Sequence, residues 1–220
     1  MVKKRETQSS IEKALNLIEI LKEKERLGVT DLSRLLGLNK NNVFRLLATL
    51  QVEGIIEQDE ETEEYKLGTK VLYLEYAYLQ GRNFLKKSKP YLRQLRRELN
   101  ETVYISILDK DDIIYIYSEE ANRSVLVHSR IAKRFKAKDT APGRALLKAK
   151  KGKKQEIIEY DFQGLELEVS EVATVIYEDK IPKAAISVVA PISRLNPSNV
   201  LEVKEKILNC ANKISQSLSV

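Results

Sequence analysis

Four polar side chains lie within six residues, and together they offer the chemistry that reads the edges of nucleic-acid bases. They are Lys40, Asn41, Asn42 and Arg45. An arginine guanidinium donates two parallel hydrogen bonds to guanine, an asparagine amide pairs with the edge of adenine, and a lysine ammonium neutralises a phosphate. The stretch therefore predicts a nucleic-acid interface, provided that a rigid element presents these side chains on an exposed surface.

The element expected to carry them is a helix over residues 39–53. Apolar side chains from Val43 to Leu50 recur at helical spacing and form one face, which leaves the polar side chains on the others. Asn39 is placed to cap the start of this helix. We call it the reading helix.

A shorter helix comes before the reading helix, and a glycine separates the two. Thr30 is placed as its N-cap, and Gly37 ends it because a residue without Cβ accommodates left-handed backbone. An earlier amphipathic helix, with Ser10 as its N-cap, packs on both. This is the helix-turn-helix plan, in which the second helix enters the major groove of DNA by its N-terminal end. The alternative is a three-helix packing module whose polar face meets only water. The residues expected to contact DNA are Thr30, Arg34, Asn39, Lys40, Asn41, Asn42 and Arg45.

A β-hairpin is predicted after the reading helix. Two short apolar segments in Gly54–Gly68 flank an acidic turn, as in the wing of a winged helix. Residues 53–64 include seven acidic side chains, which DNA phosphates repel. We therefore expect recognition to depend on the reading helix and on the basic segment Lys3–Arg5, with little contribution from the tip of the wing.

These segments resemble the DNA-binding domain of the IclR family of transcriptional regulators. The resemblance implies a winged helix-turn-helix domain over residues 1–68 and sequence-specific binding to double-stranded DNA. Asn41 and Asn42 stand where the family often has serine or threonine, which implies a different operator. The matching stretches keep the family's order and spacing without a gap: Ser10–Leu17, Leu32–Leu38, Arg45–Leu50 and Gly54–Gly68.

The net charge of the chain does not itself argue for DNA binding. The formal charge is +6, but residues 1–68 hold 11 basic and 13 acidic side chains. The excess lies in residues 69–150, with 18 basic against 9 acidic side chains. The prediction of a DNA-binding domain therefore depends on local pattern alone.

The rest of the chain predicts a linker helix and an α+β domain. Residues 69–82 carry apolar and aromatic side chains on most faces, which indicates a linker helix with a dimer contact; packing within the chain is the alternative. A helix interrupted by Pro90 then opens a domain over residues 83–220, which resembles the GAF-like effector domain of the same family. Four β-rich runs predict a mixed sheet, and a cap at 196–198 begins a final helix. The runs are Thr102–Leu108, Ile113–Tyr117, Ala173–Tyr177 and Ala184–Ala190.

The family resemblance also implies an effector site in the second domain. A small-residue turn opens a helix after Thr140, where free backbone N–H groups suit a ligand carboxylate; a purely structural helix start is the alternative. Only 39 residues separate Leu147 from Ser187, so a helical segment that helps to wall the pocket is expected to be missing. We expect any ligand to be small and less polar than an organic acid, and backbone groups could equally satisfy Ser187. The effector residues implied are Thr140, Ala141, Pro142, Gly143, Asp161, Ser170 and Ser187.

The sequence argues against an enzyme, a metal site and a cofactor. Cys210 is the single cysteine and His128 the single histidine, so no disulfide, thiolate zinc site or serine–histidine pair is assembled. The chain shows no secretory signal or membrane span, and we expect a cytoplasmic protein that makes no membrane contact. The expected partners are double-stranded DNA, further copies of the chain in a homodimer or tetramer, and a small-molecule effector. An architectural DNA-binding protein, whose second domain serves only oligomerisation, is the alternative function.

Overall fold

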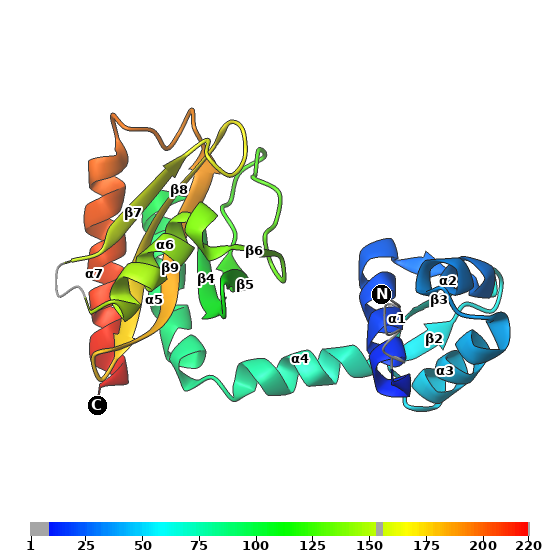
Figure 1. Cartoon of the computed structure of the whole chain (residues 1–220). Coiled ribbons are helices and arrows are strands. Elements are labelled where there is room, and N and C mark those ends of the chain that lie inside the picture. Colours follow the sequence, from blue (N-terminus) through cyan, green and yellow to red (C-terminus); the bar gives the residue numbers. More distant parts are fainter. Residues whose placement is uncertain (1–8, 153–155, 220) are drawn as a thin grey trace, which may run out of the picture. The chain divides into compact units, whose positions relative to one another are not determined.

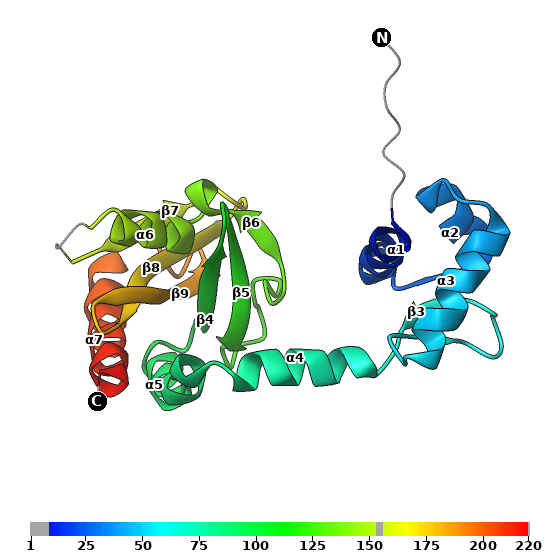
Figure 2. The same cartoon turned by 60° about the horizontal axis from the view of Figure 1, so that its bottom comes forward.

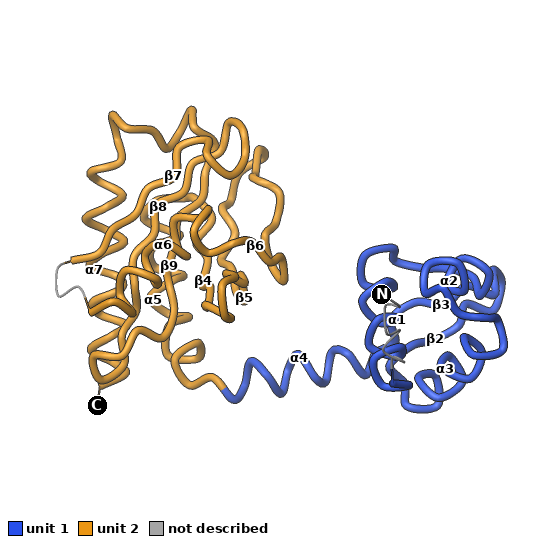
Figure 3. Tube along the Cα trace, viewed as in Figure 1, with its two compact units in different colours: residues 1–81 blue, residues 82–220 orange. Residues whose placement is uncertain are grey.

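The computed structural model describes residues 9–152 and 156–219, so the basic segment Lys3–Arg5 lies outside the described residues. The chain divides into two compact units, Met1–Gly81 and Arg82–Val220 (Figure 3). Within the described residues, no helix combines the length and the apolar composition that crossing a lipid bilayer requires.

The first unit is a small helical domain with a three-stranded sheet, labelled in Figure 1. Its strands pair antiparallel in the order β1-β3-β2, so that β2 and β3 form the predicted hairpin. Leu17, Leu32 and Leu47 come from three different helices and are fully buried in one core. The elements are α1 (Ser10–Lys24), β1 (Arg26–Leu27), α2 (Val29–Leu36), α3 (Lys40–Val52), β2 (Ile56–Gln58), β3 (Tyr65–Leu67) and α4 (Lys70–Gln80).

The helix ends of this unit confirm two sequence predictions and correct two others. Gly37 ends α2 at φ 63°, and the Asn39 side chain accepts a hydrogen bond from the Asn42 N–H, as expected. The predicted caps at Ser10 and Thr30 are wrong. Ser9 caps α1, because it forms a reciprocal capping box with Glu12 that Ser10 has no partner to make. The N-cap of α2 is Gly28, which leaves Thr30 exposed in the first helical turn.

The second unit is an α+β domain built on a six-stranded sheet. The strand order is β6-β5-β4-β9-β8-β7, and every pairing between these strands is antiparallel. The elements are α5 (Asn83–Leu99), β4 (Thr102–Asp109), β5 (Asp112–Glu119), β6 (Arg134–Lys136), the short 3-10 helix η1 (Ala137–Asp139), α6 (Ala141–Lys150), β7 (Ile158–Phe162), β8 (Val169–Glu178), β9 (Ile181–Pro191) and α7 (Val200–Leu218).

The prediction of a mixed sheet is therefore wrong, and the reason lies in the turns. Asp179 and Lys180 link β8 to β9 with φ angles of 50° and 65°. Two consecutive positive φ angles are typical of a tight hairpin turn, which returns the chain antiparallel beside the strand it has left. The sequence also missed β6 and β7, and Pro90 lies within an unbroken α5. The final helix begins at Val200, later than the cap predicted at 196–198.

Helices cover both faces of this sheet. Helix α6 packs on one face, and α5 and α7 lie side by side on the other (Figure 2). Side chains alternate between the two faces along each strand. Tyr104, Tyr115 and Val175 accordingly join the core under α6, whereas Val103 and Val172 point to the opposite face.

One edge of β8 extends beyond its neighbour β7. Their pairing runs only as far as Thr174, which lies opposite Ile158, although β8 continues to Glu178. At this edge, two serine hydroxyls, one in α7 and one just after its last residue, accept hydrogen bonds from backbone N–H groups. The N–H of Tyr177 donates to Ser215 Oγ at 2.9 Å, and the N–H of Asp179 donates to Ser219 Oγ at 3.4 Å.

Candidate nucleic-acid interface and effector site

Helix α3 keeps one face for the core and exposes the rest. Val43, Leu47 and Leu50 are buried, and the residues between them are exposed apart from Leu46, which is partly buried. The polar residues that the sequence singled out, from Lys40 to Arg45, lie in the first turns of this helix. This is the end that enters the major groove in a helix-turn-helix protein.

One exposed stripe of α3 lies beside the start of α1. Asn42, Arg45 and Thr49 follow one another at helical spacing and line a hollow of about 200 Å³. Ser10 and Lys13 of α1 line the same hollow. The structure thus brings two predicted residues, Asn42 and Arg45, together with a lysine that the sequence analysis did not select.

A second exposed stripe of α3 includes an aromatic ring. Asn41, Phe44 and Ala48 share this side of the helix. Phe44 is 50% exposed, although phenylalanine side chains are usually buried. Phenylalanine and alanine side chains can contact the methyl group of thymine in the major groove. The sequence analysis missed Phe44, and the signal that could have found it was its place outside the apolar face of the helix.

The other predicted DNA contacts differ in how free their side chains are. Asn39 caps α3 with its side-chain oxygen Oδ1, which accepts a hydrogen bond from the Asn42 backbone N–H at 2.9 Å. Arg34 Nη2 lies 2.6 Å from Asp31 Oδ1, in an exposed ion pair that a phosphate could replace. Lys40 and Thr30 are exposed. Thr30 and Arg34 belong to α2, whereas Asn39 and Lys40 stand at the start of α3, and all four side chains suit contacts to phosphate more than to bases.

The acidic wing is ordered by its own side chains. Asp59 accepts hydrogen bonds from the backbone N–H groups of Thr62 and Glu61. These bonds lower the pKa of the Asp59 carboxyl, and the bond from Thr62 has the larger effect. Asp59 also lies 3.5 Å from Arg26 of β1. The turn that it organises, over residues 60–63, is exposed.

In the second unit, the first turn of α6 leaves few backbone N–H groups for a ligand, because residues of the chain itself occupy or replace them. Thr140 caps the helix by accepting a hydrogen bond from the Gly143 N–H at 3.1 Å, and Pro142 has no N–H to offer. Gly143 packs closely, since a Cβ there would lie 2.1 Å from the Ala137 carbonyl oxygen. Thr140, Ala141, Pro142 and Gly143 are all buried. This arrangement favours the structural role for the turn that the sequence analysis kept as the alternative.

The other three predicted effector residues do not share one surface. Ser187 of β9 lies opposite Ala173 and faces α6, whereas Ser170 is three residues from Ala173 and points to the other face of the sheet. Asp161 faces α6, but its carboxylate accepts from the Gly164 and Leu165 N–H groups and so organises the turn after β7.

A buried ion pair lies between Asp161 and Ser187 on the face beneath α6. Arg130 Nη1 is 2.9 Å from Glu171 Oε2, and each side chain is only 1% exposed. The Tyr115 hydroxyl donates to both carboxylate oxygens of Glu171, at 2.9 and 3.0 Å. None of these three residues was selected from the sequence, although Glu171 is a carboxylate in the buried part of a strand of mainly apolar and β-branched residues.

Burial and pairing act against each other on these groups. Burial raises the pKa of Glu171, and the Arg130 guanidinium opposes that shift. For Arg130, burial lowers the pKa, but Glu171, Tyr115 and Glu166 together outweigh it and hold the pKa above its ordinary value. The guanidinium is therefore charged, and its loss would leave a carboxylate in a desolvated site.

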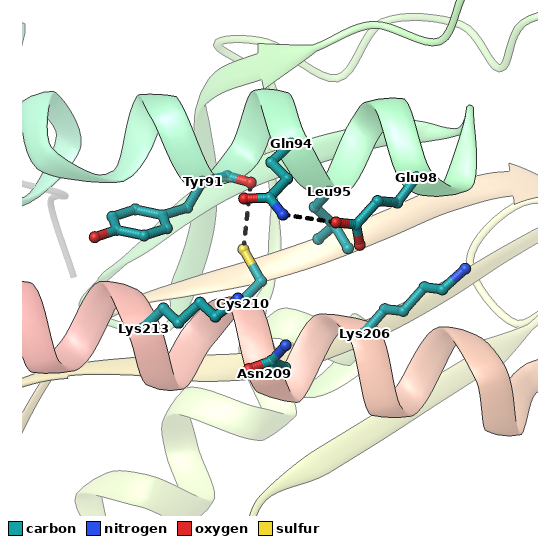
Figure 4. Close-up of a pocket in the computed structure, with 8 residues that line it drawn as sticks. All are labelled: Tyr91, Gln94, Leu95, Glu98, Lys206, Asn209, Cys210 and Lys213. Atoms are coloured by element: carbon teal, nitrogen blue, oxygen red, sulfur yellow. Dashed lines mark hydrogen bonds between the residues drawn. The ribbon is translucent and has the colours of Figure 1, made fainter.

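Two surface grooves of this unit lie elsewhere. One of about 970 Å³ is lined by the ends of α6, β8 and α7, and none of the predicted effector residues borders it. The other lies between α5 and α7 around Cys210, whose Sγ is 3.6 Å from the Tyr91 carbonyl oxygen (Figure 4). Its volume of about 20 Å³ has room for a water molecule but not for a metabolite.

The fold and these sites define a class of protein: a winged helix-turn-helix unit joined to a separate α+β unit. Comparison with known proteins agrees with this class. Residues 10–60 match the family model of the IclR helix-turn-helix domain, and residues 76–165 match that of the bacterial transcriptional regulator IclR C-terminal domain. The chain belongs to the IclR family of transcriptional regulators.

Individual relatives differ in how much of each chain aligns. The HTH-type transcriptional regulator XynR of Escherichia coli is 33% identical over 63% of this chain, and the aligned part spans only 55% of XynR. The transcriptional repressor IclR of Escherichia coli is 24% identical, with 94% of this chain and 88% of the repressor aligned. An IclR homologue from Microbacterium hydrocarbonoxydans, solved with 4-hydroxybenzoate, covers 96% of this chain and 99% of its own at a TM-score of 0.79 and 16% identity. At that identity the likeness concerns the fold.

Proposed function

We propose that this chain is a sequence-specific DNA-binding regulator of transcription that reads operator half-sites with α3. The observation that carries the proposal is the exposed N-terminal half of α3. It presents Asn41, Asn42 and Arg45 from a helix fixed by a buried core. Asparagine and arginine at this end of a reading helix have the donors and acceptors that distinguish base pairs.

The proposed division of labour has three parts. Residues 1–68 bind DNA, residues 69–82 link and dimerise, and residues 83–220 form the effector and oligomerisation domain. Helix α4 supports the second part, because Leu72, Tyr73 and Tyr76 are each more than 60% exposed. Apolar side chains displayed in this way are typical of a protein interface.

A small molecule is proposed to bias the position of the DNA-binding units. The homologue solved with 4-hydroxybenzoate supports a ligand for this fold. Because DNA fixes the spacing of two half-sites, a ligand that changes the relative position of two units changes affinity for the operator.

The test begins with the selection of preferred DNA sequences by the full chain, followed by gel-shift titration of the best sequence and of random DNA. In the variant Asn41→Ala/Arg45→Ala, we expect a loss of about 1–3 kcal/mol for each base contact removed, with random DNA less affected. Gln51→Ala, on the exposed C-terminal end of the same helix, is the matched control.

Two results would contradict the proposal. Unchanged preference in the double variant would show that α3 does not read the bases. Nearly equal affinity of the wild type for selected and random DNA would instead indicate an architectural DNA-binding protein.

A further inference from the structure

The ion pair beneath α6 has the composition of a binding site for a planar cation. Arg130 Nη1 donates to Glu171 Oε2 at 2.9 Å and to the Tyr115 hydroxyl oxygen at 3.3 Å. The Arg130 guanidinium carbon is 5.7 Å from the centre of the Tyr115 ring, within reach of a cation–π contact. Glu166 Oε1 forms an ion pair with Arg130 Nε at 3.3 Å, but the two groups are not aligned for a hydrogen bond.

Two buried serines lie on the same face of the sheet as this ion pair. Ser106 lies opposite Tyr115, and Ser187 lies opposite Tyr104 on the same face of the sheet. Both are fully buried, and neither hydroxyl completes a hydrogen bond. Ser187 is the nearer of the two to Glu171 in the sheet, because it lies two residues along β9 from Val189, which is paired with Glu171.

Arg130 reaches this site from a segment with little regular structure of its own. Residues 120–133, between β5 and β6, contain no helix and only one isolated bridge. Two tyrosines hold the backbone around Arg130. The Arg130 N–H donates to the Tyr104 hydroxyl, and the Ala132 N–H donates to the Tyr115 carbonyl oxygen. The segment thus places one side chain in a site made by the strands.

The charges of the site select against an anion. Glu171 is fully buried, Asp161 lies opposite it on β7, and Glu166 faces the same guanidinium. The three carboxylates outnumber the one guanidinium of Arg130, so a further ligand carboxylate would be repelled. A guanidinium has the opposite charge, and its planar fork of N–H donors fits a carboxylate.

We propose that Glu171 and Tyr115, with Ser187 beside them, form a binding site for a guanidinium cation, and that Arg130 of the same chain occupies it as a built-in ligand. This inference rests on the proposed function in one respect, since it concerns the domain that the function assigns to effector binding.

The test is chemical rescue of the full chain with Arg130→Ala. Thermal unfolding is followed by circular dichroism with N-ethylguanidinium chloride, and with equal concentrations of sodium chloride, urea and sodium 4-hydroxybenzoate. We expect the variant to unfold at a lower temperature than the wild type. We further expect N-ethylguanidinium to raise its midpoint by roughly 5–10 °C near saturation, as for a ligand that binds only the folded state. The other three solutes are expected to give no such rise.

Arg130→Ala/Glu171→Gln is the matched control, because it lacks the carboxylate that holds the cation. We expect no rescue in this double variant, and no rise for the wild type, whose site is filled. The proposal is overturned if N-ethylguanidinium acts no better than sodium chloride, if the double variant is rescued equally, or if 4-hydroxybenzoate rescues Arg130→Ala.

Should Arg130→Ala not fold alone, refolding from urea gives the same comparison. Recovery of the native spectrum with N-ethylguanidinium but not with sodium chloride supports the proposal, and equal recovery or none with both overturns it. DNA binding does not enter these measurements. Failure of the gel-shift test would therefore remove the proposed function and leave the outcome at Arg130 unaffected.

Discussion

At the residue scale, the exposed surface of α3 has one stripe of hydrogen-bonding side chains and one stripe that includes apolar side chains. Asn42 and Arg45 lie on the stripe beside α1, whereas Asn41 shares its stripe with Phe44 and Ala48. Hydrogen-bonding side chains distinguish guanine and adenine, and apolar side chains recognise the methyl group of thymine. Both kinds of contact are therefore available along one helix.

Phe44 is predicted to contribute to specificity at a thymine position. Its ring is half exposed, so Phe44→Ala removes little from the core and leaves the fold intact. We expect affinity for the preferred sequence to fall by about 1–3 kcal/mol, with the loss confined to one base pair. Gel-shift titration against single-base variants of the operator measures this. An equal loss on every sequence, random DNA included, would assign Phe44 a structural role instead.

Cys210 is predicted to be an unreactive thiol in the folded protein. Burial, reinforced by Glu98, raises its pKa from the ordinary 9.0 to about 12. Between these values the unfolded chain releases the thiol proton and the folded chain keeps it, so the free energy of unfolding falls as pH rises above 9. This contribution is at most about 1.4 kcal/mol per pH unit.

The measurement compares wild type with Cys210→Ala. Urea unfolding from pH 8 to pH 10.5 is expected to show the steeper decline in the wild type. In addition, dithiodipyridine at pH 8 is expected to label the native thiol only as fast as the protein opens. Rapid labelling in the absence of urea would mean that the thiol is accessible in the native state.

At the element scale, the sequence predicted what local patterns determine and missed what tertiary partners determine. Helix α3, the turn at Gly37 and the hairpin after Gly54 follow from apolar periodicity and from the backbone freedom of glycine. The cap of α1 depended on which of two adjacent serines could pair with Glu12, a choice that periodicity leaves open. Strand β7 is short, and its pairing with β8 could not be read from its own residues.

The candidate sites divide in the same way. Four of the predicted DNA contacts, Lys40, Asn41, Asn42 and Arg45, lie on one helix, so their spacing alone was enough to place them on its exposed side. The residues implied for the effector came from separate elements, and strand alternation puts Ser170 and Ser187 on opposite faces of the sheet. Arg130 could not be predicted to pair with Glu171, because they are 41 positions apart and the segment that carries Arg130 has no regular pattern.

The wing is the element whose role is most open to a direct test. Its exposed turn holds Glu60, Glu61 and Glu63, and Glu64 follows immediately. We predict that the wing stays away from phosphate, so that Glu63→Lys/Glu64→Lys changes affinity by less than about twofold near 0.15 M salt, where screening acts within about 8 Å. Fluorescence anisotropy over a salt series measures this. Tighter binding to all sequences, with a steeper salt dependence, would place the wing against the DNA backbone.

At the scale of the whole molecule, the proposed function requires two DNA-binding units in one assembly. Helix α4 offers the surface for this, since Leu72, Tyr73, Leu74 and Tyr76 are all more than half exposed. No residue of α4 is buried within the chain itself. A helix so rich in apolar side chains is expected to bury them against a partner helix of a second copy.

Leu72→Asp/Tyr76→Asp is predicted to dissociate the dimer. Because both side chains are exposed within the single chain, each unit is expected to keep its fold, as circular dichroism can verify. Light scattering is expected to give the mass of one chain, and affinity for a two-site operator is expected to fall toward that for one half-site. Glu75→Ala on the same helix is the control. An unchanged mass would assign dimerisation to another surface.

The serine hydroxyls along α7 have a consequence for the protein at high concentration. An unpaired strand edge is a template on which a strand from another molecule can add, and repetition of that step leads to aggregation. By accepting the amide protons of Tyr177 and Asp179, Ser215 and Ser219 occupy the edge that β7 leaves uncovered. We expect these two hydroxyl groups to hinder the addition of a foreign strand along this part of β8.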